Sequence, residues 1–269
     1  MITIHPIGGL GNRLRVIHSV LSLQSNNHKP FILKWPKDRH MACSYFDLFD
    51  NHNGFLIKEY SENRVRRYLD KISRFSGIKM MNINAYKETY DNKKIRELQK
   101  NGYDFNRLFD EDSIVIKTDC WFYTAEHGRF LMPEPSMEIK QKVELITANF
   151  PQNIIGVHIR EGDNEIAKSV STIDRFLSKI ESEINHNDSV HFYLSTDSPC
   201  TEEMLVNRFP GYFTVQKNKI LDRDSAISAK DAFVDMLCLS KTNKIIGSYF
   251  SSFSSVAASI SGIEKEVVR

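Results

Sequence analysis

The segment from Asn153 to Ile159 restricts the fold more than any other part of the sequence, because it is almost wholly apolar and β-branched. A short run of this kind is typical of a strand buried on both faces of a parallel sheet. Arg160 is the first charged residue beyond it, in a stretch that runs on to Asp163. Open α/β sheets bind ligands just beyond the carboxyl ends of their strands, so the sequence predicts a ligand site at Arg160.

The side chain of Arg160 indicates what that ligand is. A guanidinium group keeps its charge at any physiological pH and can bind two phosphate oxygens at once, which favours a phosphate. His158 lies two residues earlier and therefore points to the same face of the strand as Arg160. The alternative is that Arg160 only forms an ion pair at the surface.

Two prolines, Pro133 and Pro135, mark a boundary in the chain, since proline ends regular elements and favours the first turn of a helix. Strands alternate with helices on both sides, which predicts βαβ units and a parallel sheet in each half. We therefore expect an α/β protein with domains at residues 1–134 and 135–269. The expected strands are 2–6, 31–35, 114–117, 153–159, 191–194, 213–216 and 244–246, and helices are expected from about residues 136, 171, 201, 228 and 254, besides one after the turn at 8–12.

The composition is that of an ordinary soluble protein, with 41% hydrophobic and 26% charged residues among 269. A net charge of +2 argues against a strongly basic nucleic-acid binder. The four cysteines lack CxxC spacing, which argues against a disulfide framework or a structural zinc site. The sequence begins with an expected strand rather than a signal peptide and has no apolar run long enough to span a bilayer, so a cytoplasmic protein is expected.

Two further segments have the composition of anion-binding loops. The turn from Gly8 to Asn12 lies between an expected strand and an expected helix, where glycine lets the backbone approach a ligand. Its spacing is neither that of a dinucleotide fingerprint nor that of a P-loop, and a simple tight turn is the alternative. The serine-rich stretch from Gly247 to Ser255 precedes a helix, whose free N–H groups suit a phosphate; an ordinary serine N-cap is the alternative.

Asp231 and Asp235 lie four residues apart on one face of an expected helix. Asp235 is surrounded by apolar residues, where a carboxylate without partners would be costly. It is suited to accept hydrogen bonds from a donor pair such as N1–H and N2–H of guanine. The alternative is an exposed position on an amphipathic helix.

Four stretches together resemble the fucosyltransferase superfamily, which includes the α1,2-, α1,6-, nodulation and protein O-fucosyltransferases. Gly8–Asn12 is similar to its Gly-Gly-x-Gly-Asn turn, and His158–Asp163 to its His-x-Arg-Arg-x-Asp motif. Asp235–Lys241 resembles the helix whose aspartate recognises guanine, and Ser248–Ser252 the Ser/Thr-Phe-Ser-Ser loop near the donor phosphates. The family's second arginine is Glu161 here, which reverses a charge beside the expected phosphate site.

The resemblance implies a GT-B-like fold, with two Rossmann-like domains facing each other across a cleft, the first on the acceptor side and the second for the donor. It implies an inverting transfer of fucose from GDP-fucose to a glycan hydroxyl, in carbohydrate biosynthesis, without a metal or other cofactor. Arg160 would bind the β-phosphate, His158 and Asp235 the nucleoside. The remaining donor-binding candidates are Asp163, Ser251, Ser252, Gly9, Gly11 and Asn12.

The general base is not determined by the sequence, and its candidates are Asp38, Asp119 and Glu126. Residues 121–123 form either a sugar-stacking platform or core at a strand end. The basic stretch 64–74 would either dock on an anionic lipid-linked glycan or membrane surface, as a peripheral contact, or form a solvated helix face. The alternative functions are a non-catalytic protein that binds a nucleotide sugar or glycan, and a transferase that uses another nucleoside-diphosphate sugar.

Overall fold

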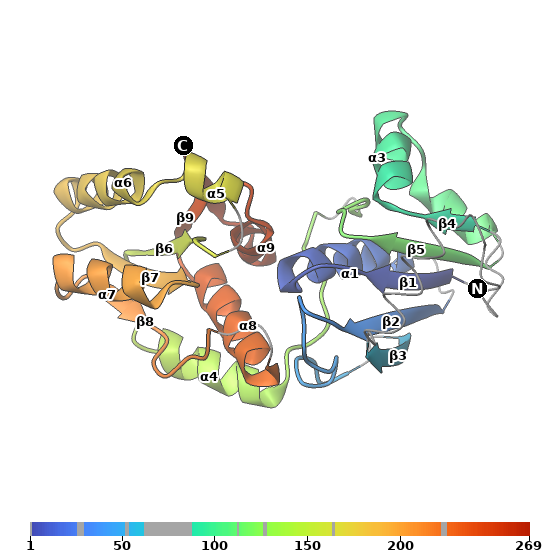
Figure 1. The fold of residues 1–269 in the computed structure, drawn as a ribbon, viewed down its shortest axis with the longest axis horizontal. Coiled ribbons are helices and arrows are strands. Elements are labelled where there is room, and N and C mark those ends of the chain that lie inside the picture. Colours follow the sequence, from blue (N-terminus) through green and yellow to red (C-terminus); the bar gives the residue numbers. More distant parts are fainter. Residues whose placement is uncertain are drawn as a thin grey trace. The chain divides into compact units, whose positions relative to one another are not determined.

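The computed structural model describes residues 2–25, 30–51, 54–61, 88–111, 113–125, 128–162, 165–221 and 225–269. The chain divides into two compact units, Met1–Glu134 and Pro135–Arg269, and each unit holds one five-stranded parallel sheet (Figure 1). The division falls inside the Pro-Glu-Pro segment that ends the first expected domain. The basic stretch 64–74 lies outside the described residues.

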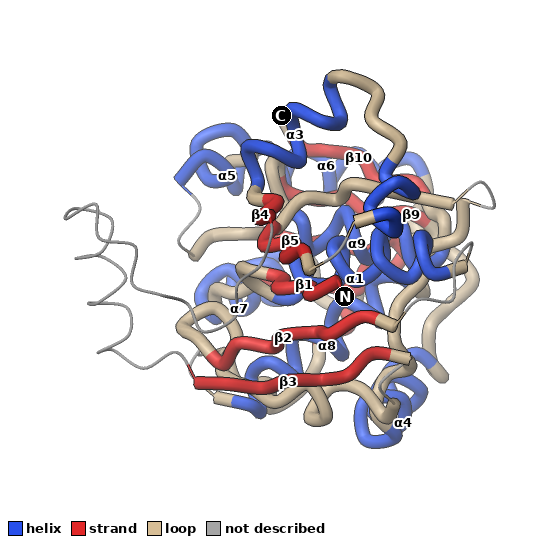
Figure 2. Tube along the Cα trace, turned by 90° about the vertical axis from the view of Figure 1, so that its right-hand side faces the viewer, coloured by secondary structure: helices blue, strands red, loops and turns tan. Residues whose placement is uncertain are grey.

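In the first unit the strand order is β3-β2-β1-β5-β4, and Figure 2 shows these strands edge to edge. The central strand β1 (Ile2–Pro6) pairs with β2 on one side and with β5 on the other. The order of the strands along the chain therefore reverses between β1 and β5. The other elements are α1 (Leu10–Gln24), β2 (Phe31–Lys37), β3 (Phe55–Ser61), β4 (Glu88–Tyr90), α3 (Asn92–Lys100), the 3-10 helix η1 (Phe105–Asp110) and β5 (Ile114–Thr118).

In the second unit the order is β10-β9-β6-β7-β8, and the reversal lies between β6 and β9. The central strand β6 (Ile154–Ile159) is buried along its whole length, as its apolar sequence predicts. The other elements are α4 (Met137–Thr147), α5 (Glu165–Val170), α6 (Ile173–His186), β7 (His191–Thr196), α7 (Pro199–Arg208), β8 (Phe213–Val215), α8 (Ala226–Ser240), β9 (Lys244–Ser248), α9 (Ser252–Ser261) and β10 (Glu264–Val268).

The two faces of this second sheet are covered differently. On one face Val157, Phe192 and Ile246 join an apolar core with Phe176 of α6 and Leu205 of α7. On the other face α8 and α9 pack on the sheet and on each other. Glycines make room for them: a Cβ at position 156 would lie 2.9 Å from Leu239, and one at position 247 would lie 2.8 Å from Oγ of Ser254. Glycine is thus required where α8 and α9 approach the strands closely.

The strands that the sequence analysis missed are at or near the edges of the sheets. Most residues of β3 and of β10 are exposed or half-buried, and β4 has three residues. Edge strands bury little apolar surface, so their sequences carry a weak signal. In the part of the chain that the structure describes, no helix combines the length and apolarity needed to cross a bilayer.

The close packing of α8 gives a test of the fold. Gly156→Ala places a methyl group against Leu239 and Thr242, each 2.9 Å from the added atom, and should reduce the free energy of unfolding by about 1–3 kcal/mol. Urea unfolding measures the loss. In a Leu239→Ala background the same change should cost less, because one of the two clashing side chains is gone. Equal costs in both backgrounds would contradict this packing.

Candidate functional site

The loops after β6 and β9 meet where the strand order of the second unit reverses. The backbone N–H of Arg160, just past the end of β6, donates to Oγ of Ser248, the last residue of β9, at 2.9 Å. Ser248 is fully buried, and its hydroxyl lies 3.4 Å from the carbonyl oxygen of His158. A crevice outside the strand ends at such a reversal is the usual ligand site of open α/β sheets. The expected site at Arg160 therefore lies at this reversal.

Asp197, the residue after β7, holds the loop that carries Arg160. Nη1 of Arg160 lies 2.8 Å from Oδ2 of Asp197, with side chains 28% and 20% exposed. The same carboxylate accepts the backbone N–H of Glu161 at 2.8 Å and that of Gly162 at 3.1 Å. The ion pair weighed as the alternative for Arg160 is thus present, and it orients the guanidinium at the strand ends. The sequence places Asp197 at the end of the polar Ser195–Asp197 segment, at the expected carboxyl end of a strand, and the structure adds that it pairs with Arg160.

Glu161, which replaces the second arginine of the fucosyltransferase motif, forms a hydrogen bond with a neighbouring helix. Its carboxylate accepts a hydrogen bond from Oγ1 of Thr201, in the first turn of α7. A negative charge is stabilised at the amino end of a helix. The charge reversal is therefore partly offset by α7.

His158 is buried, 5% exposed, and stacks on Phe253 of α9 with ring centroids 4.9 Å apart. Burial, and then the positive charge of Arg160, lowers the pKa of His158 well below its ordinary value, so the ring is neutral at pH 7. Its Nδ1 has no hydrogen-bond partner among the described residues. Buried polar atoms without partners are rare in folded proteins, so this nitrogen marks a place for a ligand atom or water.

The serine loop does not form the ordinary N-cap that was its alternative. Ser251 is the N-cap residue of α9, yet its side chain makes no capping hydrogen bond. Oγ of Ser254, fully buried in the first turn, also has no partner among the described residues. The first turn of α9 therefore keeps N–H groups for an external acceptor. Beside it, Phe250 is 74% exposed and has a left-handed backbone, with φ of 52°.

Asp235 is 4% exposed, so the alternative of an exposed helix position is wrong. Its carboxylate accepts hydrogen bonds from Oη of Tyr193 at 2.5 Å and Oγ of Ser195 at 3.1 Å, and Nζ of Lys219 lies 3.5 Å away. Burial raises the pKa of Asp235, and the charge of Lys219 opposes that rise. The carboxylate is thus satisfied from within the unit. Guanine would have to replace at least one of these donors, and recognition of guanine by Asp235 stays a prediction.

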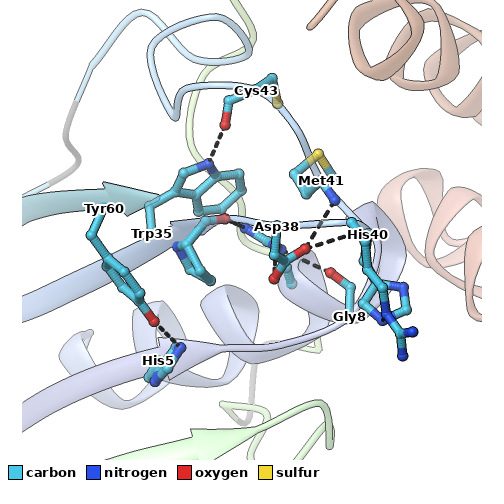
Figure 3. Close-up of polar contacts among 11 residues, drawn as sticks. His5, Gly8, Trp35, Asp38, His40, Met41, Cys43 and Tyr60 are labelled. Carbon is cyan, nitrogen blue, oxygen red and sulfur yellow. Dashed lines mark hydrogen bonds and ion pairs between the residues drawn. The ribbon is translucent and has the colours of Figure 1, made fainter. Parts of the chain in front are cut away.

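In the first unit, the glycine turn is tied to a buried arginine. Gly8 has φ of +84°, which glycine adopts without strain, and its carbonyl accepts from Nε of Arg13 at 2.8 Å. Arg13 is fully buried, donates to the carbonyl of Pro36 at 2.7 Å and lies 4.6 Å from the ring centroid of Trp35. Its Nη2 also forms an ion pair with Oδ2 of Asp38, at 3.0 Å (Figure 3). This network joins the turn after β1 to the end of β2.

Gly9, Gly11 and Asn12, predicted to bind the donor, lie at the start of α1. Gly9 is the N-cap of that helix and Gly11 is buried within it. Oδ1 of Asn12 accepts from Arg15 at 2.6 Å, and a Cβ at Gly8 would lie 2.6 Å from Nδ2 of Asn12. The turn therefore needs glycine at position 8 for local reasons, and its role toward a donor stays a prediction.

The three base candidates have different surroundings. Both oxygens of Asp38 are occupied, because Oδ2 pairs with Arg13 while Oδ1 accepts the N–H groups of His40 and Met41 (Figure 3). A carboxylate held in this way is a poor proton acceptor. Glu126, like the donor candidate Asp163, lies outside the described residues.

Asp119, just after β5, is half-buried at the strand reversal of the first unit. Its carboxylate accepts only a long contact from Sγ of Cys120, at 3.7 Å, among the described residues. The charge of Arg15 lies close enough to interact with it, since Asp119 raises the pKa of Arg15 against the lowering by burial. Phe122 is buried in the core, which excludes it as a stacking platform, and Trp121 packs edge-on against Phe130.

No protein-family model and no curated protein sequence matches this chain. Solved structures do. NodZ α-1,6-fucosyltransferase soaked with GDP-fucose superposes with a TM-score of 0.60 at 15% identity, over 96% of this chain and 92% of that one. The fucosyltransferase NodZ from Bradyrhizobium is among the similar structures. A variant of Arabidopsis thaliana FUT1 in complex with GDP gives a TM-score of 0.60 at 13% identity, over 99% of this chain and 69% of that one. POFUT1 in complex with GDP gives 0.58 at 10%, over 99% and 97%.

The chain has the fold of these fucosyltransferases. The expected fold class, two Rossmann-like units of the GT-B type, is thereby confirmed. At identities this low, the similarity establishes the fold and leaves activity to the residues of the site.

The strained backbone at Phe250 gives a second test. Phe250→Asn should raise the free energy of unfolding by about 0.5–1 kcal/mol, because asparagine tolerates the left-handed conformation and the exposed ring buries little surface. Urea unfolding measures the gain. Phe46→Asn is the matched control, since Phe46 is 53% exposed and is not among the residues with positive φ. An equal effect at both positions would show that Phe250 is not strained.

Proposed function

We propose that the protein is an inverting, metal-independent glycosyltransferase that moves fucose from GDP-fucose to a hydroxyl group of a glycan. The observation that supports this most directly is the pairing of Arg160 with the uncapped first turn of α9 at the strand reversal of the second unit. A guanidinium and a helix amino terminus both bind phosphate groups through several N–H donors. The second unit is thus proposed as the donor domain and the first as the acceptor side.

The identity of the donor is supported by the similar structures. NodZ is described with GDP-fucose and with GDP, and both POFUT1 and Arabidopsis FUT1 with GDP. This chain has His158 and Arg160 at the end of β6 and the serine loop at the end of β9, the stretches that resemble the family. The orphan Nδ1 of His158 lies in the same region and suits a hydrogen bond from or to the nucleoside.

The proposed chemistry follows from where charge develops. As the bond between fucose and GDP breaks, negative charge accumulates on the leaving diphosphate. Arg160 and the amino end of α9 would stabilise that charge, and preorganised groups of this kind typically contribute about 3–4 kcal/mol each. The sugar, with oxocarbenium character, would then be captured by an acceptor hydroxyl on the face opposite the leaving group, which inverts the anomeric carbon. Charge stabilisation by protein groups is what would make a metal dispensable.

For the general base we propose Asp119. Of the described candidates it is the one whose carboxylate is not committed to an ion pair or to backbone N–H groups. It follows β5 at the strand reversal of its own unit, where ligands of open sheets bind. The positive charge of Arg15 lies close enough to interact with the Asp119 carboxylate.

The donor assignment is tested by titrating the protein with GDP, ADP and UDP in the presence of EDTA. We expect selective binding of GDP. Arg160→Ala should weaken it strongly and lower fucose transfer about a hundredfold or more, because the leaving group loses a preorganised cation. Arg208→Ala, which removes an exposed ion pair with Glu181, is the matched control and should change neither.

Equal binding of the three nucleotides would instead favour a transferase with another nucleoside-diphosphate sugar. Selective GDP binding without turnover of GDP-fucose over a range of glycan acceptors would favour a non-catalytic binding protein. Binding that requires a divalent cation would contradict metal independence.

The base assignment has its own test. Asp119→Asn should lower the rate of fucose transfer by about a hundredfold or more while the affinity for GDP stays the same, since the base acts on the acceptor. Asp38→Asn should instead lower the free energy of unfolding, because it leaves the buried guanidinium of Arg13 without its charged partner. Transfer rates and urea unfolding of both variants separate the two roles. Full activity of Asp119→Asn would exclude it as the base.

A further inference from the structure

Lys265, in the edge strand β10, places a positive charge beneath the serine loop. Its Nζ donates to the carbonyl oxygen of Ser251 at 3.3 Å and to Oγ of Ser255 at 2.9 Å. Its Cε would lie 3.0 Å from a Cβ at Gly247, so the side chain runs along the sheet under α9. The sequence analysis did not single out this residue, because its place beside the loop is produced by the pairing of β10 with β9.

Within the described part of the chain, the charge of Lys265 is not neutralised. No acidic group of the described residues pairs with it, and α9 contains no titratable side chain. The ammonium group lies at the amino end of α9, where the helix dipole is also positive. Two unfavourable terms, lost hydration and the dipole, therefore act together in the ligand-free protein. An anion at the first turn of α9 would relieve both.

Lys265 shares a face of the sheet with the donor-site residues. Residue 265 is level with Ile245 on β9, Gly247 follows on the same face, and His158 is level with Gly247 on β6. The positive charge of Lys265 is among the causes that lower the pKa of His158. Its field therefore reaches the expected donor site. At the strand ends, the charge of Arg160 is offset by its ion pair with Asp197, so a second positive charge nearby would strengthen the attraction for an anion.

We propose that the ammonium group of Lys265 serves as an internal counter-charge for the diphosphate of the donor, acting through the serine loop and the first turn of α9. The inference rests on the function proposed above and adds a positioning residue to it. Lys265 does not touch the reacting atoms. It holds Ser251 and Ser255 in place and supplies positive charge that only a bound anion neutralises.

This arrangement links donor binding to protonation. Burial lowers the pKa of Lys265 to about 8 in the ligand-free protein, and a bound diphosphate would raise it. At pH 8.5 the wild-type protein should therefore take up part of a proton for each GDP bound.

Other charged groups lie on the elements that adjoin Lys265. They are Glu264 and Glu266 on the opposite face of β10, Lys179 of α6 paired with Glu266, Lys244 of β9 paired with Glu183, Arg269 over Tyr249, and His158, which is neutral at this pH.

The lowered pKa of Lys265 changes the free energy of folding in the direction opposite to that of a lysine paired with an acidic group. Because the folded-state pKa of Lys265 is below its unfolded value, the charged form destabilises the ligand-free protein below about pH 8. This cost fades as the pH rises from about 8 toward the ordinary lysine value of about 10.5. Lys265→Met should therefore melt at the same temperature as wild type or higher at pH 7, with the difference shrinking near pH 10. A purely structural lysine would give a lower melting temperature.

The deciding experiment is calorimetric titration of wild type, Lys265→Met and Lys241→Met with GDP, inorganic pyrophosphate and guanosine. Lys241 is exposed at the opposite ends of the strands and is the matched control. We expect Lys265→Met to bind GDP and pyrophosphate about tenfold more weakly, the change that corresponds to one pKa unit, with guanosine unaffected. Repeating the GDP titration at pH 8.5 in buffers of different ionisation enthalpy measures proton uptake, which should be present in wild type and absent in Lys265→Met.

The outcomes separate this inference from the donor assignment. Equal GDP affinity of wild type and Lys265→Met, or no proton uptake by wild type, would overturn the role of Lys265 and leave the donor assignment intact. Pyrophosphate binding that weakens in Lys265→Met, with GDP bound no better than pyrophosphate, would support the counter-charge and contradict the guanine donor. Binding of neither ligand by wild type would overturn both.

Discussion

The hydrogen bond between the backbone of Arg160 and the hydroxyl of Ser248 is the contact on which the candidate site depends. It joins the ends of β6 and β9, which pair directly although nearly ninety residues separate them along the chain. With this contact, the loop that carries the guanidinium and the loop that begins α9 form one rigid edge. Asp197 then orients the guanidinium from a third strand end, β7. The carboxyl ends of three strands of one sheet, β6, β7 and β9, thus contribute to one site.

Helices α8 and α9 pack closely on the same sheet. Gly156 and Gly247 have no side chain on the face that these helices cover, and a methyl group at either position would overlap Leu239, Thr242 or Ser254. The close approach brings the first turn of α9 over His158, whose ring stacks on Phe253. Two buried polar atoms of this region, Nδ1 of His158 and Oγ of Ser254, have no hydrogen-bond partner within the part of the chain that the structure describes. Each of these two atoms can form a hydrogen bond with a ligand or with water.

The positions of the charged side chains around the candidate site cannot be predicted from the motif at residues 158–163 alone. Glu161 stands where the family has a second arginine, and its carboxylate bonds to Thr201 at the amino end of α7. Lys265 lies on the other side of the site, under the serine loop, without an acidic partner among the described residues. Asp235, by contrast, is surrounded by Tyr193, Ser195 and Lys219 and is satisfied within the fold. A short motif thus identifies candidate residues, whereas the order of the strands in the sheet determines which charged groups lie close together.

The sequence by itself determined the fold class, the central strand β6 and the strand-end positions of Arg160 and Ser251. A strand buried on both faces needs apolar, β-branched residues, and the edge of the sheet where ligands bind needs polar ones, so both leave a local pattern in the sequence. The strand signal was weak in β3, β4 and β10, at or near the sheet edges, since such strands are little constrained by burial. Only the tertiary structure decided that Asp197 holds Arg160, that Asp38 is committed to Arg13, and that Lys265 lies under α9. These contacts join residues that are distant along the chain, and their partners follow from strand order and register, which no local pattern encodes.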